Sequence, residues 1–199
     1  VVSISILYEI SKGHNGLEEA LDSILDQASK AVDSGANIII LSDRMVSKEM
    51  APIPALLACS MVNSGLRKLG KRSKLSIIVE SAEPREVHHF ALLFGFGASA
   101  INPYLVNEII GQQIEQEDSP EYSFSEAINN YNKAVGKGIL KVMNKIGIST
   151  LNSYRGSQLF ECIGINTKVV DKYFPNTPTR IQGIGLYEIE KEITKRHRK

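Results

Sequence analysis

Short polar clusters follow apolar, strand-sized runs at four places in the chain, and they hold the side chains best suited to chemistry. The candidate residues are Ser42, Asp43, Arg44, Glu80, Ser81, Asn102, Tyr104, Tyr154 and Arg155. The carboxyl ends of parallel strands meet at one edge of a sheet, where ligands and partner surfaces usually lie. These side chains can therefore line a ligand pocket or a partner interface. Asp43, Arg44, Glu80 and Arg155 can equally pair with one another to hold loops, and the residues alone leave both interpretations open.

Arg155 gives the pairing interpretation its most specific form. It follows a predicted strand at 148–151, beside Tyr154 and Gly156. In a parallel sheet its natural partners are the carboxylates of Asp43 and Glu80, because a guanidinium fork matches a carboxylate in geometry and charge. We expect a largely buried pair there.

Three other features suggest a site at first, but their spacing or context argues against one. His88 and His89 are adjacent and point about 100° apart on a helix, whereas a helical metal pair needs i, i+3 or i, i+4 spacing. The glycine-rich segment at 95–100 leaves a helix and enters a strand, the reverse of a dinucleotide fingerprint. Cys59 and Cys162 lie far apart and form no metal or redox motif, so we interpret both as buried thiols.

Apolar periodicity predicts the elements that position the candidate residues. Strand-sized runs occur at 2–8, 37–41, 75–79, 98–101 and 148–151. Helical patterns occur at 17–34, 55–69, 84–94, 105–110, 126–135, 139–146, 157–163, 169–174 and 186–193. Strands alternating with helices indicate a parallel sheet, and the apolar run at 37–41 is typical of one covered on both faces. The predicted fold class is α/β, mostly parallel with alternating helices and incomplete (β/α) barrel-like, because a closed barrel needs eight strands.

The length of 199 residues fits a single domain with a core of its own. Within it, the polar stretch 111–122 has little to bury, and we interpret it as an exposed loop or a subdomain boundary. We also expect Gly136 and Gly138 to interrupt the helical pattern around them, since glycine disfavours helix interiors.

Charge and composition exclude some functions. The 23 basic and 22 acidic residues are nearly balanced, which disfavours nucleic acid or a membrane surface as a partner. No apolar run reaches the length of a membrane span. Two unpaired thiols favour the cytoplasm or another reducing compartment. The chain begins at Val1 rather than methionine, so we expect it to be a piece of a longer protein.

Six long, irregular motifs together resemble the central domain of the large (alpha) subunit of glutamate synthase. They are LSDR at 41–44, APIPALLA at 51–58, VESAEPREVHHFALLFGFGA at 79–98, INPYL at 101–105, NYNKAVGKGILKVMNKIGISTLNSYRG at 130–156 and RIQGIGL at 180–186. They occur in the family's order. In one departure, residues 61–64 read MVNS where the family typically has a histidine cluster, so we assign no role to that position.

The resemblance implies a multidomain enzyme that forms glutamate from glutamine-derived ammonia and 2-oxoglutarate. Its amidotransferase domain and FMN-bearing barrel would be partners of this segment in the same polypeptide. FMN and an iron–sulfur cluster are implied in the full-length enzyme, whereas we expect no cofactor, no metal and no catalytic residue in this chain. The segment would serve as a scaffold and help line the ammonia path.

Two alternatives from other classes stay open. One is a stand-alone α/β enzyme, a lyase or isomerase acting on a small anion, and the other is a non-catalytic binding module. A closed pocket with buried groups of displaced pKa would favour the enzyme. A broad apolar face left uncovered would favour the inter-domain segment.

Overall fold

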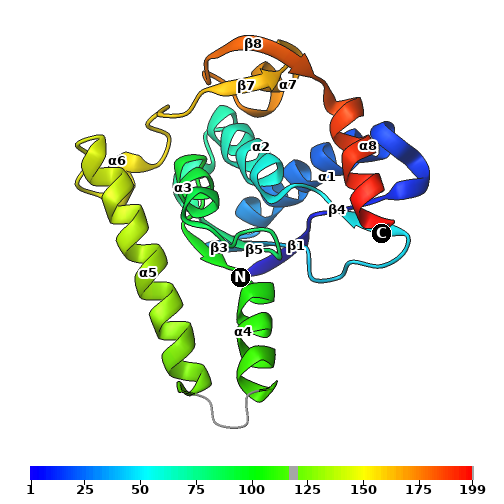
Figure 1. The fold of residues 1–199 in the computed structure, drawn as a ribbon. Helices are drawn as coiled ribbons and strands as arrows, with labels where there is room; N and C mark the ends of the chain where they lie inside the picture. Colours follow the sequence, from blue (N-terminus) through cyan, green and yellow to red (C-terminus); the bar gives the residue numbers. More distant parts are fainter. Residues whose placement is uncertain (117–120, 199) are drawn as a thin grey trace.

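A four-stranded parallel sheet forms the centre of the structure, which is a computed structural model describing residues 1–116 and 121–198 (Figure 1). Its strands follow the order β1-β3-β5-β6. They are β1 (Val2–Ser5), β3 (Ile38–Ser42), β5 (Ser76–Glu80) and β6 (Ala100–Asn102). The predicted α/β class with a mostly parallel sheet and alternating helices is confirmed, and the strands described here close no barrel.

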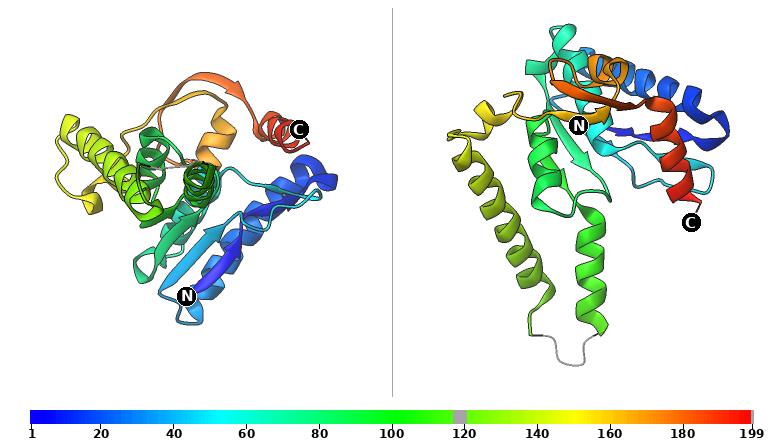
Figure 2. Two further views of the ribbon diagram at one scale, coloured as in Figure 1. Left: turned by 60° about the horizontal axis from the view of Figure 1, so that its bottom comes forward. Right: turned by 45° about the horizontal axis from the view of Figure 1, so that its top comes forward.

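Three helices connect these strands and pack on one face of the sheet (Figures 1 and 2). They are α1 (Gly13–Asp33), α2 (Ala55–Lys68) and α3 (Val87–Gly95). Parallel neighbours need such crossovers, because a strand must return to the same end of the sheet before it can pair. Ile39, Leu41, Ile77 and Val79 point toward the helices and are fully buried.

The opposite face of the sheet is more open. Strand register aligns Ser3, Ile40, Ile78 and Ala100 in one row across it. The two isoleucines are only half-buried, and the outer two residues are exposed. A parallel sheet is normally covered on both faces. The expectation of two covered faces is therefore wrong for the described residues. The apolar run at 37–41, from which it was inferred, does form a strand of the sheet.

Smaller elements surround the sheet. β2 (Leu7–Glu9) pairs antiparallel with β4 (Met50–Pro52), and β7 (Cys162–Ile165) pairs parallel with β8 (Thr179–Ile184). The remaining elements near the core are η1 (Ile10–Lys12), η2 (Arg72–Lys74), α7 (Thr167–Tyr173) and α8 (Leu186–His197). In Figure 1 the β7–β8 pair lies beyond the helical layer, on the side away from the sheet.

A helical hairpin projects from this body (Figures 1 and 2). It consists of α4 (Tyr104–Gln116) and α5 (Phe124–Lys145). The interpretation of 111–122 as a loop is wrong for 111–116, which are helical because glutamine and glutamate favour helix. Residues 117–120 lie outside the described residues. The expected interruption is also absent, since α5 runs unbroken through Gly136 and Gly138 and its apolar face packs on α3.

Two further predictions fail after α5. The expected strand at 148–151 is instead irregular chain leading into α6 (Leu151–Tyr154), because the Thr150 hydroxyl accepts a hydrogen bond from Ser153 N–H and caps a helix. The expected helix at 157–163 is instead irregular chain that enters β7 at Cys162. The helical propensity of this segment is outweighed by strand pairing with β8, which is too far away in the sequence for a local pattern to show.

None of the helices described in residues 1–116 and 121–198 combines the length and apolar character needed to cross a membrane.

The two glycines of α5 supply a matched test of this packing. A Cβ at Gly138 would lie 2.7 Å from Val87 Cγ1, whereas a Cβ at Gly136 would meet nothing within 4 Å. We predict that Gly136→Ala raises the free energy of unfolding by about 0.5–1 kcal/mol through helix propensity. Gly138→Ala should lower it by about 1–3 kcal/mol through overpacking. Urea unfolding of both variants measures this, and equal shifts would contradict the packing of α5 on α3.

Candidate functional site

The side chain of Asp43 joins three elements at the carboxyl edge of the sheet. Its Oδ2 accepts a 2.6 Å hydrogen bond from the Ser81 hydroxyl, and its Oδ1 accepts one of 2.7 Å from the Tyr104 hydroxyl. The backbone N–H of Ala82 lies 3.2 Å from both oxygens. Asp43 is 1% exposed, so these bonds replace the water that a buried carboxylate loses.

Glu80 forms a second junction beside it. The Ser42 hydroxyl donates to Oε2 at 2.6 Å, while Arg44 Nε and Asn102 Nδ2 donate to Oε1 at 2.9 and 3.1 Å. Strand register explains the contact, because Ser42, Glu80 and Asn102 are aligned neighbours on β3, β5 and β6. The Arg44 guanidinium lies 4.2 Å above the Tyr104 ring and so connects the two junctions.

The surroundings of these groups shift their titration in opposite directions. Partial burial acts to raise the pKa of Glu80, but the hydrogen bonds from Ser42 and Arg44 and the Arg44 charge outweigh it, so the pKa lies below its ordinary value. The pKa of Tyr104 is raised, first by burial and then by its bond to the Asp43 carboxylate. Glu80 is therefore held ionised and Tyr104 protonated at neutral pH.

Seven of the nine predicted residues thus meet at one edge, and we call them the strand-end network. They are Ser42, Asp43, Arg44, Glu80, Ser81, Asn102 and Tyr104. Their polar groups bond chiefly to one another. This arrangement matches the interpretation in which such residues hold loops, and it leaves few groups free to bind a ligand.

Tyr154 and Arg155 lie elsewhere, and the expected pairing of Arg155 with Asp43 or Glu80 is wrong. The buried Tyr154 hydroxyl donates to Ala91 O at 3.0 Å. Arg155 donates to Ser99 Oγ at 3.0 Å and to Asn152 Oδ1. Ser99 directly precedes β6, so Arg155 lies at the amino edge of the sheet. The error follows from the missing strand at 148–151, which would have brought Arg155 to the carboxyl edge.

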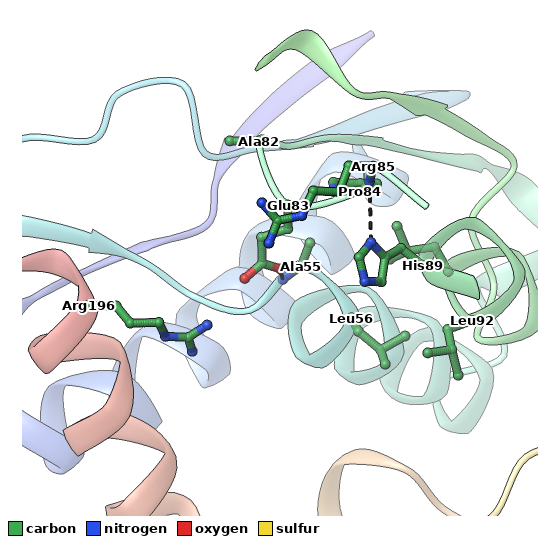
Figure 3. Close-up of a pocket in the computed structure, with 10 residues that line it drawn as sticks. Ala55, Leu56, Ala82, Glu83, Pro84, Arg85, His89, Leu92 and Arg196 are labelled. Atoms are coloured by element: carbon green, nitrogen blue, oxygen red, sulfur yellow. Dashed lines mark hydrogen bonds between the residues drawn. The ribbon is translucent and has the colours of Figure 1, made fainter. Parts of the chain in front are cut away.

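A pocket of about 410 Å³ lies next to the strand-end network (Figure 3). The chain leaving Ser81 lines one side with Glu83, whose Oε2 accepts a 2.7 Å hydrogen bond from Ala55 N–H at the start of α2. His89 lies deeper, with Nδ1 accepting from Arg85 N–H at 3.3 Å. Arg196 reaches toward the pocket from α8, which lies more than a hundred residues later in sequence.

The Glu83 carboxyl group in this pocket has a raised pKa. Desolvation raises the pKa of Glu83, the Asp43 charge adds to it, and the Ala55 N–H and the charge of Arg196 oppose it. Sequence reasoning missed both Glu83 and Arg196. The position of Glu83, three residues after β5 and just before Pro84, is a usable signal, whereas nothing in the sequence places Arg196 of α8 in the same pocket as Ala55 of α2.

The other residues considered from the sequence, His88, Cys59 and Cys162, contribute to packing rather than to a site. His88 packs edge-on against Phe160, with ring centroids 6.2 Å apart. Cys59 is fully buried, which raises the pKa of its thiol to about 12, and Cys162 is also a free thiol. Within residues 1–116 and 121–198, no group of three or more His, Cys, Asp or Glu side chains could hold a metal ion. Two separated cysteines do not fit an iron–sulfur cluster, which needs several thiolates together.

The fold and the site together define a class of protein. The chain is a parallel α/β unit whose strand-end side chains bond to one another and whose sheet is helix-covered on one face. A model of the glutamate synthase central domain matches residues 1–166. The chain belongs to this family, as its sequence motifs predicted.

Relatives match nearly the whole chain. It is 47% identical to the glutamate synthase [NADPH] large chain of Bacillus subtilis over 182 residues, covering 92% of this chain and 12% of the relative. The glutamate synthase [NADH] of Schizosaccharomyces pombe is 40% identical over 95% of the chain, which is 9% of that protein. The ferredoxin-dependent glutamate synthase of Pyropia yezoensis is 36% identical over 100% of the chain, which is 14% of that protein. The chain therefore spans about a tenth of the length of these relatives.

The lowered pKa of Glu80 predicts a specific dependence of stability on acid. A depressed folded pKa contributes stability that is present above the unfolded pKa, near 4.5, and is lost as pH falls through the folded pKa. We predict that Glu80→Gln is less stable than the parent chain at about pH 7, by about 1 kcal/mol. Its stability should fall less steeply with acid, as measured by urea unfolding at about pH 7 and about pH 3.

Glu121→Gln is the control, because Glu121 is exposed and lies outside the network. It should follow the parent curve. A Glu80→Gln variant whose stability falls as steeply as that of the parent chain would contradict the assigned role of Glu80.

Proposed function

We propose that this chain is the central segment of a glutamate synthase, an oxidoreductase that forms glutamate from glutamine-derived ammonia and 2-oxoglutarate. The observation that carries the proposal is the match of 92–100% of the chain to glutamate synthases with three different electron donors. A segment common to NADPH-, NADH- and ferredoxin-dependent relatives serves a step that all of them share. Nitrogen assimilation in the cytoplasm, or another reducing compartment, is the setting proposed for it.

Within that enzyme, we assign the segment a scaffolding role as one domain, between an amidotransferase domain and an FMN-binding domain of the same polypeptide. The strand-end network supports this role, because its charged groups and hydroxyls form hydrogen bonds that join β3, β5 and α4. FMN and the iron–sulfur cluster are assigned to the rest of the polypeptide. The segment would also line part of the path for ammonia.

Two apolar surfaces support contact with other domains. Ile163 and Ile181 are register partners on β7 and β8, and they are 68% and 59% exposed on the same side of the pair. Ile40 and Ile78 lie half-buried on the open face of the sheet. Apolar surface that is accessible to water often marks a protein–protein interface, because removing it from water on association lowers the free energy.

One observation favours a second candidate, a stand-alone lyase or isomerase acting on a small anion. Glu83 has a raised pKa in a pocket that also holds His89 and Arg196, and such groups are suited to general acid–base work. Glu83 is nevertheless bonded to the N–H of Ala55 at the start of α2, an arrangement that helix capping explains. We therefore rank this candidate second.

The two candidates differ in what the 199-residue chain does alone. We predict that it neither hydrolyses glutamine nor forms glutamate, because the reactive centres lie in the other domains. A polypeptide that extends it to the length of its relatives should do both. Coupled assays for glutamate on both proteins measure this, and turnover by the short chain that Glu83→Gln abolishes would favour the stand-alone enzyme.

A charged residue on the exposed β7–β8 face tests the domain contacts. In the extended polypeptide, we predict that Ile163→Arg increases the glutamine hydrolysed per glutamate formed, since a buried unpaired charge would loosen the interface. Ile163→Val is the matched control and should leave the ratio unchanged. An unchanged ratio in Ile163→Arg would show that this face does not contact another domain during turnover.

A further inference from the structure

A second pocket, of about 410 Å³, lies at the amino edge of the sheet, the edge opposite the strand-end network. Three arginines from separate elements line it: Arg67 in the last turn of α2, Arg72 in η2 and Arg155 just after α6. Its other lining residues are Asn63, Ser73, Gly97, Asn152 and Gly156. The strand-end network and the two apolar surfaces described above include none of these residues.

Arg72 is held rigidly by neutral acceptors. Its Nε donates to Asn63 Oδ1 at 2.6 Å, and its Nη1 and Nη2 donate to the carbonyl oxygens of Leu75 and Gly97 at 2.7 and 2.8 Å. Gly97 permits this approach, because it has φ +117° and a Cβ there would lie 2.5 Å from Asn63 Oδ1. The guanidinium is thus fixed in place while its charge stays uncompensated.

The other two arginines form the opposite side of the pocket. Arg155 is fixed by its bonds to Ser99 and Asn152. Arg67 Nη1 lies 3.7 Å from where a Cβ of Gly156 would be, so the turn after α6 brings Arg67 and Arg155 together. Both amide oxygens in the lining accept bonds from arginines, which leaves the amide NH₂ groups free to donate.

Within the described part of the chain, no Asp or Glu oxygen lies within 4 Å of Arg67, Arg72 or Arg155, although arginines so placed usually pair with acids. Like charges gathered in this way repel one another. Burial, followed by the positive charges of Arg155 and Arg67, lowers the pKa of Arg72, and a bound anion would relieve that repulsion.

We propose that the pocket formed by Arg67, Arg72 and Arg155 binds a phosphate or phosphoryl group. The lining offers donors and positive charge, and a phosphoryl group carries negative charge and several acceptor oxygens, with a single O–H donor in the inorganic dianion. Guanidinium N–H groups suit phosphate oxygens, and two of the three guanidinium groups are already held in place by protein acceptors, so little side-chain entropy is lost on binding. The source is free phosphate or the phosphoryl group of a small metabolite.

Isothermal titration calorimetry on the 199-residue chain tests this, with inorganic phosphate and glycerol 3-phosphate as probes at constant ionic strength. We expect saturable binding of one phosphate per chain. Tighter binding of the ester would identify a metabolite as the source, and tighter binding of inorganic phosphate would identify the free ion. Succinate, a dianion without phosphate geometry, should bind at least about tenfold more weakly.

Arg67→Ala and Lys68→Ala are the matched variants, because both remove one positive charge from exposed neighbouring positions of α2 and only Arg67 lines the pocket. Arg67→Ala should weaken phosphate binding about tenfold to a hundredfold, and Lys68→Ala should leave it unchanged. Arg155→Ala should weaken it similarly. Absence of saturable binding, or equal losses in Arg67→Ala and Lys68→Ala, would overturn the proposal.

Discussion

The buried carboxylate of Asp43 is the constraint on which the arrangement of the other elements depends. It accepts hydrogen bonds from Ser81, Ala82 and Tyr104, which follow two further strands of the sheet. A carboxylate that is 1% exposed must keep these donors, because losing them would leave a charge without water or partner. The ends of β3 and β5 and the start of α4 are consequently held together.

This junction explains how the projecting hairpin is attached. Tyr104 is the first residue of α4, so its bond to Asp43 fixes the base of the hairpin, whose α5 packs on α3. Arg44 lies over the Tyr104 ring and pairs with Glu80, which extends the constraint to the open face of the sheet. The surfaces assigned to neighbouring domains are thereby set on a rigid base.

The two edges of the sheet differ in how their charges are satisfied. At the carboxyl edge, acids, hydroxyls and Arg44 satisfy one another within the strand-end network. At the amino edge, Arg67, Arg72 and Arg155 gather without an acid in the described residues. The first edge therefore behaves as internal structure, and the second is prepared to receive a group from outside.

The sheet and most of the strand-end network could be predicted from the sequence because both follow from local patterns. Apolar runs at 37–41 and 75–79 identify β3 and β5, and parallel register then places Ser42 beside Glu80 without further information. The position of Arg155 could not be found this way. The Ile148–Leu151 run has strand propensity, but a Thr150 cap and the packing of Tyr154 under α3 leave 148–150 irregular and start a helix at Leu151.

Long-range pairing accounts for the other errors. The predicted helix at 157–163 overlaps the start of β7, because the pairing of β7 with β8 is not visible in a short stretch of sequence. Gly136 and Gly138 were expected to break α5, but the apolar stripe at Ile139 and Met143 packs against Phe90 and outweighs the propensity cost. Glu83 and Arg196 share a pocket because α8 packs on α1 and β4, a long-range contact that no local pattern predicts.

A double-mutant cycle between Asp43 and Tyr104 tests the central claim most directly. The free energies of unfolding of Asp43→Ala, Tyr104→Phe and the double variant are compared with that of the parent chain. If Asp43 holds α4 to the strand ends through the Tyr104 hydroxyl, the two substitutions should be coupled by about 1 kcal/mol or more. Losses that add to within about 0.3 kcal/mol would contradict the account, because the two side chains would then stabilise the fold independently.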